Sequence, residues 1–171
     1  MKTKITYLLL FGSLLIMLSG CGKGNKELDA YYEGMNAFTT EITAIKDNME
    51  SIDRESADAT TELLGYLDQL EEQFGVLAEM EVPKEFAGNE QLSDEAYSYM
   101  QEANRLFHEF YDDPESDRAI FDAASENYSR AMKRVGYISS ILKGETPEGD
   151  GVDVTEEDMS DFDPVTDEAD E

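Results

Sequence analysis

The chain has 171 residues, 40% of them hydrophobic, and a formal net charge of −27. This size allows one modest domain with appendages, and the charge excludes the basic stripe that binding to nucleic-acid phosphates requires. The same charge disfavours adsorption onto an anionic lipid surface, which attracts Lys and Arg.

The first twenty residues are organised like an export signal. A basic start, residues 1–4, precedes an apolar run, residues 5–17, which is shorter than the ~20 residues that a membrane-spanning helix needs. Leu18, Ser19, Gly20 and Cys21 follow. This tetrapeptide resembles the lipobox of bacterial lipoproteins. The resemblance implies that a diacylglyceryl lipid is attached to the Cys21 sulfur and that cleavage between Gly20 and Cys21 removes residues 1–20.

Cys21 is the only cysteine, so it has no partner for a disulfide within the chain. The alternative to lipidation is an uncleaved amino-terminal helix with an incidental cysteine. We favour the lipoprotein interpretation, in which residues 21–27 are a lipidated cysteine and a glycine-rich tether. It predicts a protein held by its lipid on the extracytoplasmic face of the cell membrane.

Residues 28–143 show helical periodicity in four segments. Two sets of apolar residues repeat every seven positions through the first segment, which ends near residue 52. A second stripe predicts a helix from about 57 to 81, which Val82 and Pro83 stop because the residue before proline disfavours helix. Residues 84–92 are predicted to be a connection with a short helix around Phe86.

The third helix is expected to begin with Ser93 as its N-cap. Asp113 and Pro114 are expected to cap the fourth helix, and Lys143 and Gly144 to end it.

Short connections make consecutive helices antiparallel, so the pattern predicts an all-α protein with an up-down-up-down four-helix bundle. The alternative is a long helical hairpin that dimerises as a coiled coil. Apolar residues flank the stripes and make them wider than a two-stranded coil needs, which favours the bundle. These flanking residues are Tyr32, Leu64, Tyr66, Leu106, Ile120 and Ile141.

Residues 144–171 form an acidic tail, with thirteen Asp and Glu residues and no Lys or Arg. Such a segment cannot bury enough apolar surface to offset its ordering entropy, and it is predicted to be disordered. We interpret it as a solubilising spacer. The alternative is a strip that collects calcium or binds a partner.

Catalytic chemistry has little support in the sequence. His108 is the only histidine, and Arg105 stands where a helical di-metal site would place a glutamate. We therefore predict no enzyme activity, no metal site and no cofactor beyond the lipid on Cys21.

One cluster of cations is a candidate docking site. We expect three cations on one turn of the fourth helix to lie on its outer face, where they could bind an anionic envelope polymer or a protein partner. They are Arg130, Lys133 and Arg134. The alternative is that they pair with acids of a neighbouring helix or of the tail. Tyrosines such as Tyr31 and Tyr128 are interpreted as packing at the bundle rim, with contact surfaces as the alternative.

The body resembles small helical bacterial lipoproteins of unknown function and matches no specific family. We expect a non-enzymatic binding or scaffold domain anchored at the cell envelope. The alternative is an extracytoplasmic sensor or carrier of a small molecule or metal ion with a pocket in the bundle. A polar hole at Tyr31, Tyr128 or His108 would favour that alternative, and a dry core would favour a partner surface.

Overall fold

The computed structural model of the protein describes residues 25–113 and 115–147. Over these ranges the chain forms four α-helices and one short 3-10 helix, and it forms no strand there. The all-α prediction is therefore confirmed. The elements are α1 (Lys26–Glu50), α2 (Ala59–Ala78), η1 (Lys84–Phe86), α3 (Gly88–Asp112) and α4 (Arg118–Leu142).

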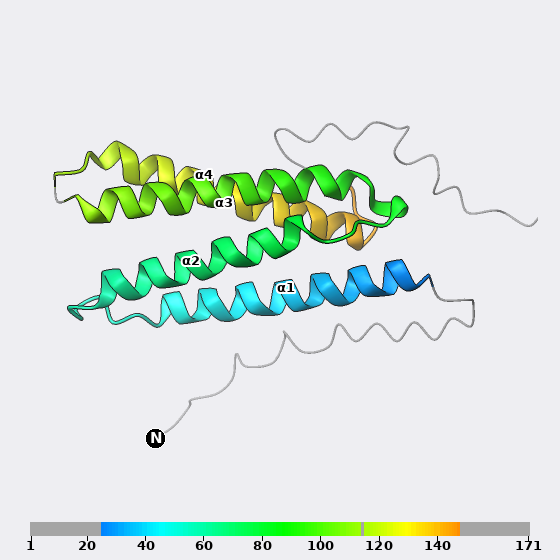
Figure 1. Ribbon diagram of the computed structural model, residues 1–171, viewed down its shortest axis with the longest axis horizontal. Helices are drawn as coiled ribbons and strands as arrows, with labels where there is room; N and C mark the ends of the chain where they lie inside the picture. The colour runs from blue at the N-terminus through cyan, green and yellow to red at the C-terminus, as the bar shows by residue number, and fades with distance from the viewer. Residues whose placement is uncertain (1–24, 114, 148–171) are drawn as a thin grey trace, which may run out of the picture.

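The four helices lie nearly side by side and alternate in direction (Figure 1). Each packs against its neighbour in the sequence, with the most extensive contact between α3 and α4. This is the predicted up-down-up-down arrangement. The start of α1 and the end of α4 consequently lie at the same end of the bundle (Figure 1).

The apolar stripes of all four helices meet in one core. In its middle the rings of Phe38 and Phe74 join α1 to α2 edge to face, with centroids 5.5 Å apart. Phe107 and Phe121 make the same kind of contact between α3 and α4, at 5.6 Å. Every helix contributes buried residues to this core, among them Met35, Ile42, Leu67, Leu70, Leu77, Met100, Ala124, Val135 and Ile138.

The residues that flank the stripes are half-buried against the same core. This holds for Tyr32, Leu64, Tyr66, Leu106 and Ile141. Their burial within a single chain is what a four-helix bundle requires, whereas a hairpin would leave this apolar surface for a second copy to cover. The bundle is thus the arrangement of the described residues.

The predicted start of the third helix is wrong. Helix α3 begins at Gly88, so Ser93 lies inside the helix and is only 2% exposed. The first turn is held in place by Asn89, which is buried and donates a hydrogen bond to the Tyr31 hydroxyl. This tertiary contact overrides the local turn preference of the Gly-Asn pair. The short helix expected around Phe86 is confirmed as η1.

The predicted cap of the fourth helix is also wrong. Asp113 follows the end of α3, and its carboxylate accepts from the Glu115 backbone N–H within the connecting turn. The N-cap of α4 is Asp117, whose side chain accepts from the Ala119 N–H at 2.9 Å. Both aspartates offer the same local chemistry, and the path of the chain between α3 and α4 selects the second. Gly144, at φ 72°, lies just beyond the end of α4, as predicted.

Phe74→Ala should destabilise the bundle by about 3–5 kcal/mol, because Phe74 is 0% exposed and its removal leaves a cavity beside Phe38. Urea unfolding followed by circular dichroism measures the change. Val76→Ala, on the exposed side of the same helix, is the matched control and should cost less than about 0.5 kcal/mol. Equal losses in the two variants would contradict the described core.

Candidate functional site

The lipobox and most of the acidic tail lie outside the described residues. Gly20 and Cys21 fall in the first of these segments, and residues 148–171 form the last. Cleavage, lipidation and tail disorder therefore stay predictions. Within residues 25–113 and 115–147, no helix has both the length and the apolar character needed to cross a bilayer.

The cationic cluster of α4 is divided between two environments. The Arg134 guanidinium is 12% exposed, pairs with Glu95 of α3 at 2.5 Å, and lies 5.7 Å from the ring centroids of Tyr99 and Tyr137. The Glu95 carboxyl accepts from Gln91 as well, and the hydrogen bonds from Gln91 and Arg134 outweigh partial burial and lower its pKa. Arg134 is thus held in the α3–α4 seam, as the pairing alternative expects.

The other two cations are on the surface. Arg130 pairs with Glu126 one turn earlier on α4, and Lys133 lies beside the ring of Tyr137. Exposed pairs of this kind contribute about 0.2–1 kcal/mol, so Arg130 remains available to an outside partner. Docking at Arg130 and Lys133 remains a prediction, and Arg134 contributes mainly to the packing of α4 on α3.

His108 takes part in a polar network between α2 and α3. Its Nε2 lies 2.9 Å from Asp68 Oδ1. Asn104, one turn earlier on α3, donates from Nδ2 to the same Asp68 oxygen at 2.9 Å and to Glu71 Oε2 at 2.6 Å. The two amide protons of Asn104 therefore hold two carboxylates of α2 in fixed positions.

These contacts change the acidity of Asp68. Partial burial by itself would raise its pKa, but the hydrogen bonds from Asn104 and His108, together with the charge of His108, lower it below 3.8 overall. The carboxylate form is thus favoured in the folded protein. No group of three or more His, Cys, Asp and Glu side chains is placed to hold a metal ion within the described ranges.

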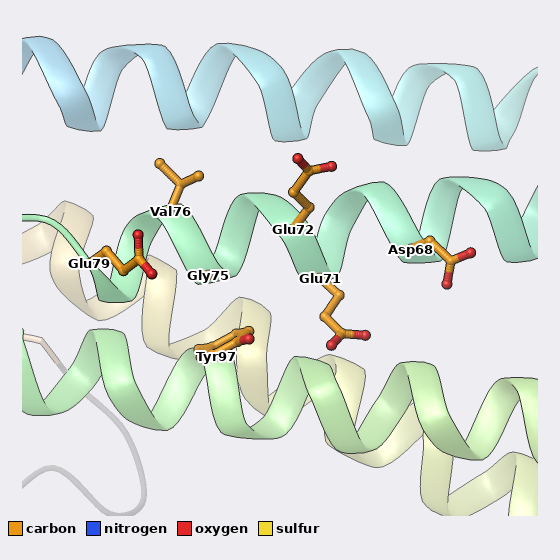
Figure 2. A pocket seen from close by; sticks show the side chains of 7 residues that line it. All are labelled: Asp68, Glu71, Glu72, Gly75, Val76, Glu79 and Tyr97. Atoms are coloured by element: carbon orange, nitrogen blue, oxygen red, sulfur yellow. The ribbon is translucent and has the colours of Figure 1, made fainter.

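Asp68 and Glu71 belong to an acidic groove on the outside of the bundle. The groove has a volume of about 400 Å³ and is open to solvent. It is lined by five residues of α2, by Glu79 just after the end of α2, and by one residue of α3. Glu72 and Val76 extend from α2 on the side of α1, while Tyr97 lies along α3 below Gly75 (Figure 2). The lining residues are Asp68, Glu71, Glu72, Gly75, Val76, Glu79 and Tyr97.

Gly75 lies against the Tyr97 ring. A Cβ at this position would stand 3.5 Å from Tyr97 Cε2, which is an ordinary van der Waals contact, so α2 packs closely on the ring here. The Tyr97 hydroxyl accepts from Gln101 Nε2 at 2.9 Å, which holds the ring along α3.

A second polar feature lies in the core, near the ends of the described chain. Asn89 Nδ2 donates to the Tyr31 hydroxyl at 3.1 Å, and Ser93 lies one turn further along α3. Within the described part of the chain, Asn89 Oδ1 and Ser93 Oγ are buried without a hydrogen-bond partner. Burial raises the pKa of the Tyr31 hydroxyl, so it stays protonated. This polar layer is surrounded by apolar side chains of the core.

Sequence analysis missed the groove and the layer. The signals were present, because Asn104 follows Met100 by four residues, a position that the stripe of the third helix reserves for apolar side chains. Acids at 68, 71, 72 and 79 also repeat at helical spacing. In a chain with forty acids, however, that spacing had no diagnostic value before α3 was placed beside α2.

Comparison with known proteins adds no functional assignment. No family model matches the chain, and neither a curated protein nor a solved structure matches it.

Acid should remove the contribution of Asp68 to stability. Its pKa is lower in the folded than in the unfolded state, so its contribution is complete above the unfolded pKa, near 3.9, and is lost as the pH falls through the folded value. Asp68→Asn should therefore have a lower urea midpoint than the parent at pH 7. The difference between the two midpoints should shrink as the pH falls below about 4. Asp47→Asn, on the exposed face of α1, is the control. A pH-independent difference would contradict this account.

Proposed function

We propose that this protein is a membrane-anchored extracytoplasmic lipoprotein whose helical bundle binds a partner, or serves as a scaffold, at the cell envelope without catalysing a reaction. The anchor is supported by the signal and lipobox pattern of residues 1–21. The bundle would be held outside the membrane by the lipid on Cys21 and by the tether that precedes α1. This tether is shorter than predicted, because Lys26 and Glu27 already belong to α1.

The binding role is supported by the grooves of the described residues, which lie on the outer surface of the bundle. Two hollows in the described residues are open grooves on the outer surface, one on α2 and α3 and one along the Thr-rich face of α1. The interior between the helices is occupied by interlocking apolar side chains. A protein of this build offers surface to another molecule more readily than it encloses a substrate.

The proposal also agrees with the geometry of the chain ends. Because α1 starts and α4 ends at one end of the bundle, the tether and the acidic tail would leave from that same end (Figure 1). The anchored end of the domain would then carry the tail's negative charge, which repels anionic headgroups. The sides of the helices would stay free for a partner.

Cys21→Ser should abolish anchoring, since the serine hydroxyl does not accept the diacylglyceryl group by thioether formation. We expect an uncleaved precursor that incorporates no labelled fatty acid. In cell fractionation it should no longer be recovered with the lipid-anchored proteins of the membrane. Metabolic labelling and cell fractionation measure both effects. Gly24→Ser, which makes a serine change in the tether, should be processed and labelled normally. A processed, acyl-labelled Cys21→Ser protein would refute the anchor.

Binding to an envelope partner has its own test. Crosslinking in intact cells, followed by pull-down of the anchored protein, should recover a complex that the Cys21→Ser variant does not form. If the same complexes form without the anchor, envelope location is not part of the function.

The buried polar layer supports a second candidate, an extracytoplasmic carrier or sensor of a small molecule. Asn89 Oδ1 and Ser93 Oγ, both without partners in the described residues, would accept hydrogen bonds from a ligand that enters when α1 separates from α3. Tyr31 would form part of the same site through its contact with Asn89.

Substitutions in this layer separate the two candidates. Tyr31→Phe alone should destabilise the bundle by about 1–3 kcal/mol, because it leaves the buried Asn89 amide unpaired. Tyr31→Phe with Asn89→Leu replaces both partners and should restore stability. Native mass spectrometry should find the parent free of bound small molecules if the bundle is a partner-binding domain. A ligand that copurifies with the parent and is absent from the double variant would favour the carrier.

A further inference from the structure

The residues that line the acidic groove on α2 and α3 carry negative charge and no positive charge of Lys or Arg. Asp68, Glu71, Glu72 and Glu79 line it, and no Lys or Arg does so in the described ranges. Elsewhere on α3, by contrast, Glu102 and Glu109 both pair with Arg105. The groove therefore concentrates negative potential that no cation lining it offsets.

Asn104 lies directly behind this groove and is only 6% exposed. Its side chain is directed at the groove wall, because Nδ2 donates to both Asp68 and Glu71. The opposite orientation would set the amide oxygen against two carboxylates, so the placement of the donor is determined by charge. The amide oxygen is left buried with no partner in the described part of the chain.

This arrangement costs stability, because the buried amide oxygen has lost its hydration and has gained no hydrogen-bond partner in the described residues. A leucine at this position of α3 would continue the apolar stripe without that cost. What Asn104 provides instead is a fixed position for two carboxylates that would otherwise repel each other. Such preorganisation is useful when a cationic ligand must meet both groups at once.

The groove also has an apolar component. Val76 is the one exposed large hydrophobic side chain of the described residues, at 47%, and it lies between Glu72 and Glu79 on α2. The Tyr97 ring lies below Gly75 in the view of Figure 2 and also lines the groove. An apolar centre with a charged rim is the usual composition of a protein–protein contact.

We propose that the acidic groove, formed by the seven lining residues named above, docks a basic amphipathic helix of a partner protein, which places an apolar side chain on Val76 and Tyr97 and Lys or Arg on the surrounding carboxylates. This inference rests on the proposed role in partner binding and names the surface and the chemistry of the partner. A helix is favoured over a small polycation because the groove is open and has an apolar centre.

The test measures binding of synthetic helical peptides to the full-length chain in a non-ionic detergent. One fluorescent peptide carries leucine and lysine on opposite faces of the helix. A second has the same charge, with glutamine in place of leucine. Fluorescence anisotropy at two salt concentrations gives the affinities. The amphipathic peptide should bind more tightly than the all-polar one, and added salt should weaken its binding.

Three variants probe the parts of the groove. Glu72→Gln with Glu79→Gln should weaken binding roughly three- to tenfold by removing two exposed charge partners. Val76→Ser should reduce the preference for the amphipathic peptide over the all-polar one. Asn104→Leu leaves the charge unchanged and removes the two hydrogen bonds to Asp68 and Glu71. We expect it to bind the peptide more weakly. If its melting temperature is no lower than that of the parent, the loss of affinity comes from the positions of these two carboxylates.

The matched control is Glu33→Gln with Glu41→Gln, which removes two exposed acids from α1. It should leave affinity within about twofold of the parent, since these acids lie outside the groove. Equal weakening by the control pair, or equal binding of both peptides, would overturn the proposal and leave only attraction by net charge.

Different results would contradict the groove proposal and the proposed role at the cell envelope. If the peptide binds without dependence on the groove while crosslinking still recovers an envelope partner on another face, the groove proposal is wrong and the partner-binding role stands. If crosslinking recovers no partner and the peptide still binds through the groove, the surface exists and the envelope role is wrong.

Discussion

The apolar stripes of α1 to α4 can leave water only by packing on one another, because each runs the length of a helix that has no other partner within the described chain. The contact of Phe38 with Phe74 shows this dependence between the first two helices, and that of Phe107 with Phe121 shows it between the last two. Burial of such side chains is the main favourable term in a domain of this size. The packing of the stripes also determines where the acidic groove, the Arg134–Glu95 pair and the buried polar layer lie.

High negative charge limits what else such a core can support. Like charges at the surface repel one another and destabilise the compact state, so each buried polar group adds to a cost that is already present. The bundle nevertheless buries Asn89, Ser93 and Asn104. Asn89 and Asn104 each hold a side chain of another helix, Tyr31 in one case and the two α2 carboxylates in the other. Their contacts locate the two features that we connect with binding.

The cations of α4 illustrate how a surface charge acquires a structural use. Arg134 joins α4 to α3 through Glu95 and lies near two tyrosine rings, which cover much of the guanidinium. An arginine can do this because its planar group both pairs with a carboxylate and stacks on aromatic faces. Arg130, only one turn away, faces solvent and pairs locally. Sequence spacing alone placed both in one cluster.

The periodicity of the apolar residues predicted the number and order of the helices, because each stripe has to be buried against another helix. The short connections predicted that consecutive helices alternate in direction. The signal and lipobox prediction at Cys21 rests on local residue order alone, and it stays a prediction. The starts of α3 and α4 needed the tertiary structure. Several residues near each start offer equal capping chemistry, and only the packing of Asn89 on Tyr31 and the course of the α3–α4 turn choose between them. The groove required the tertiary structure as well, since the four acids in and just after α2 become one site only when Asn104 of α3 lies beside two of them.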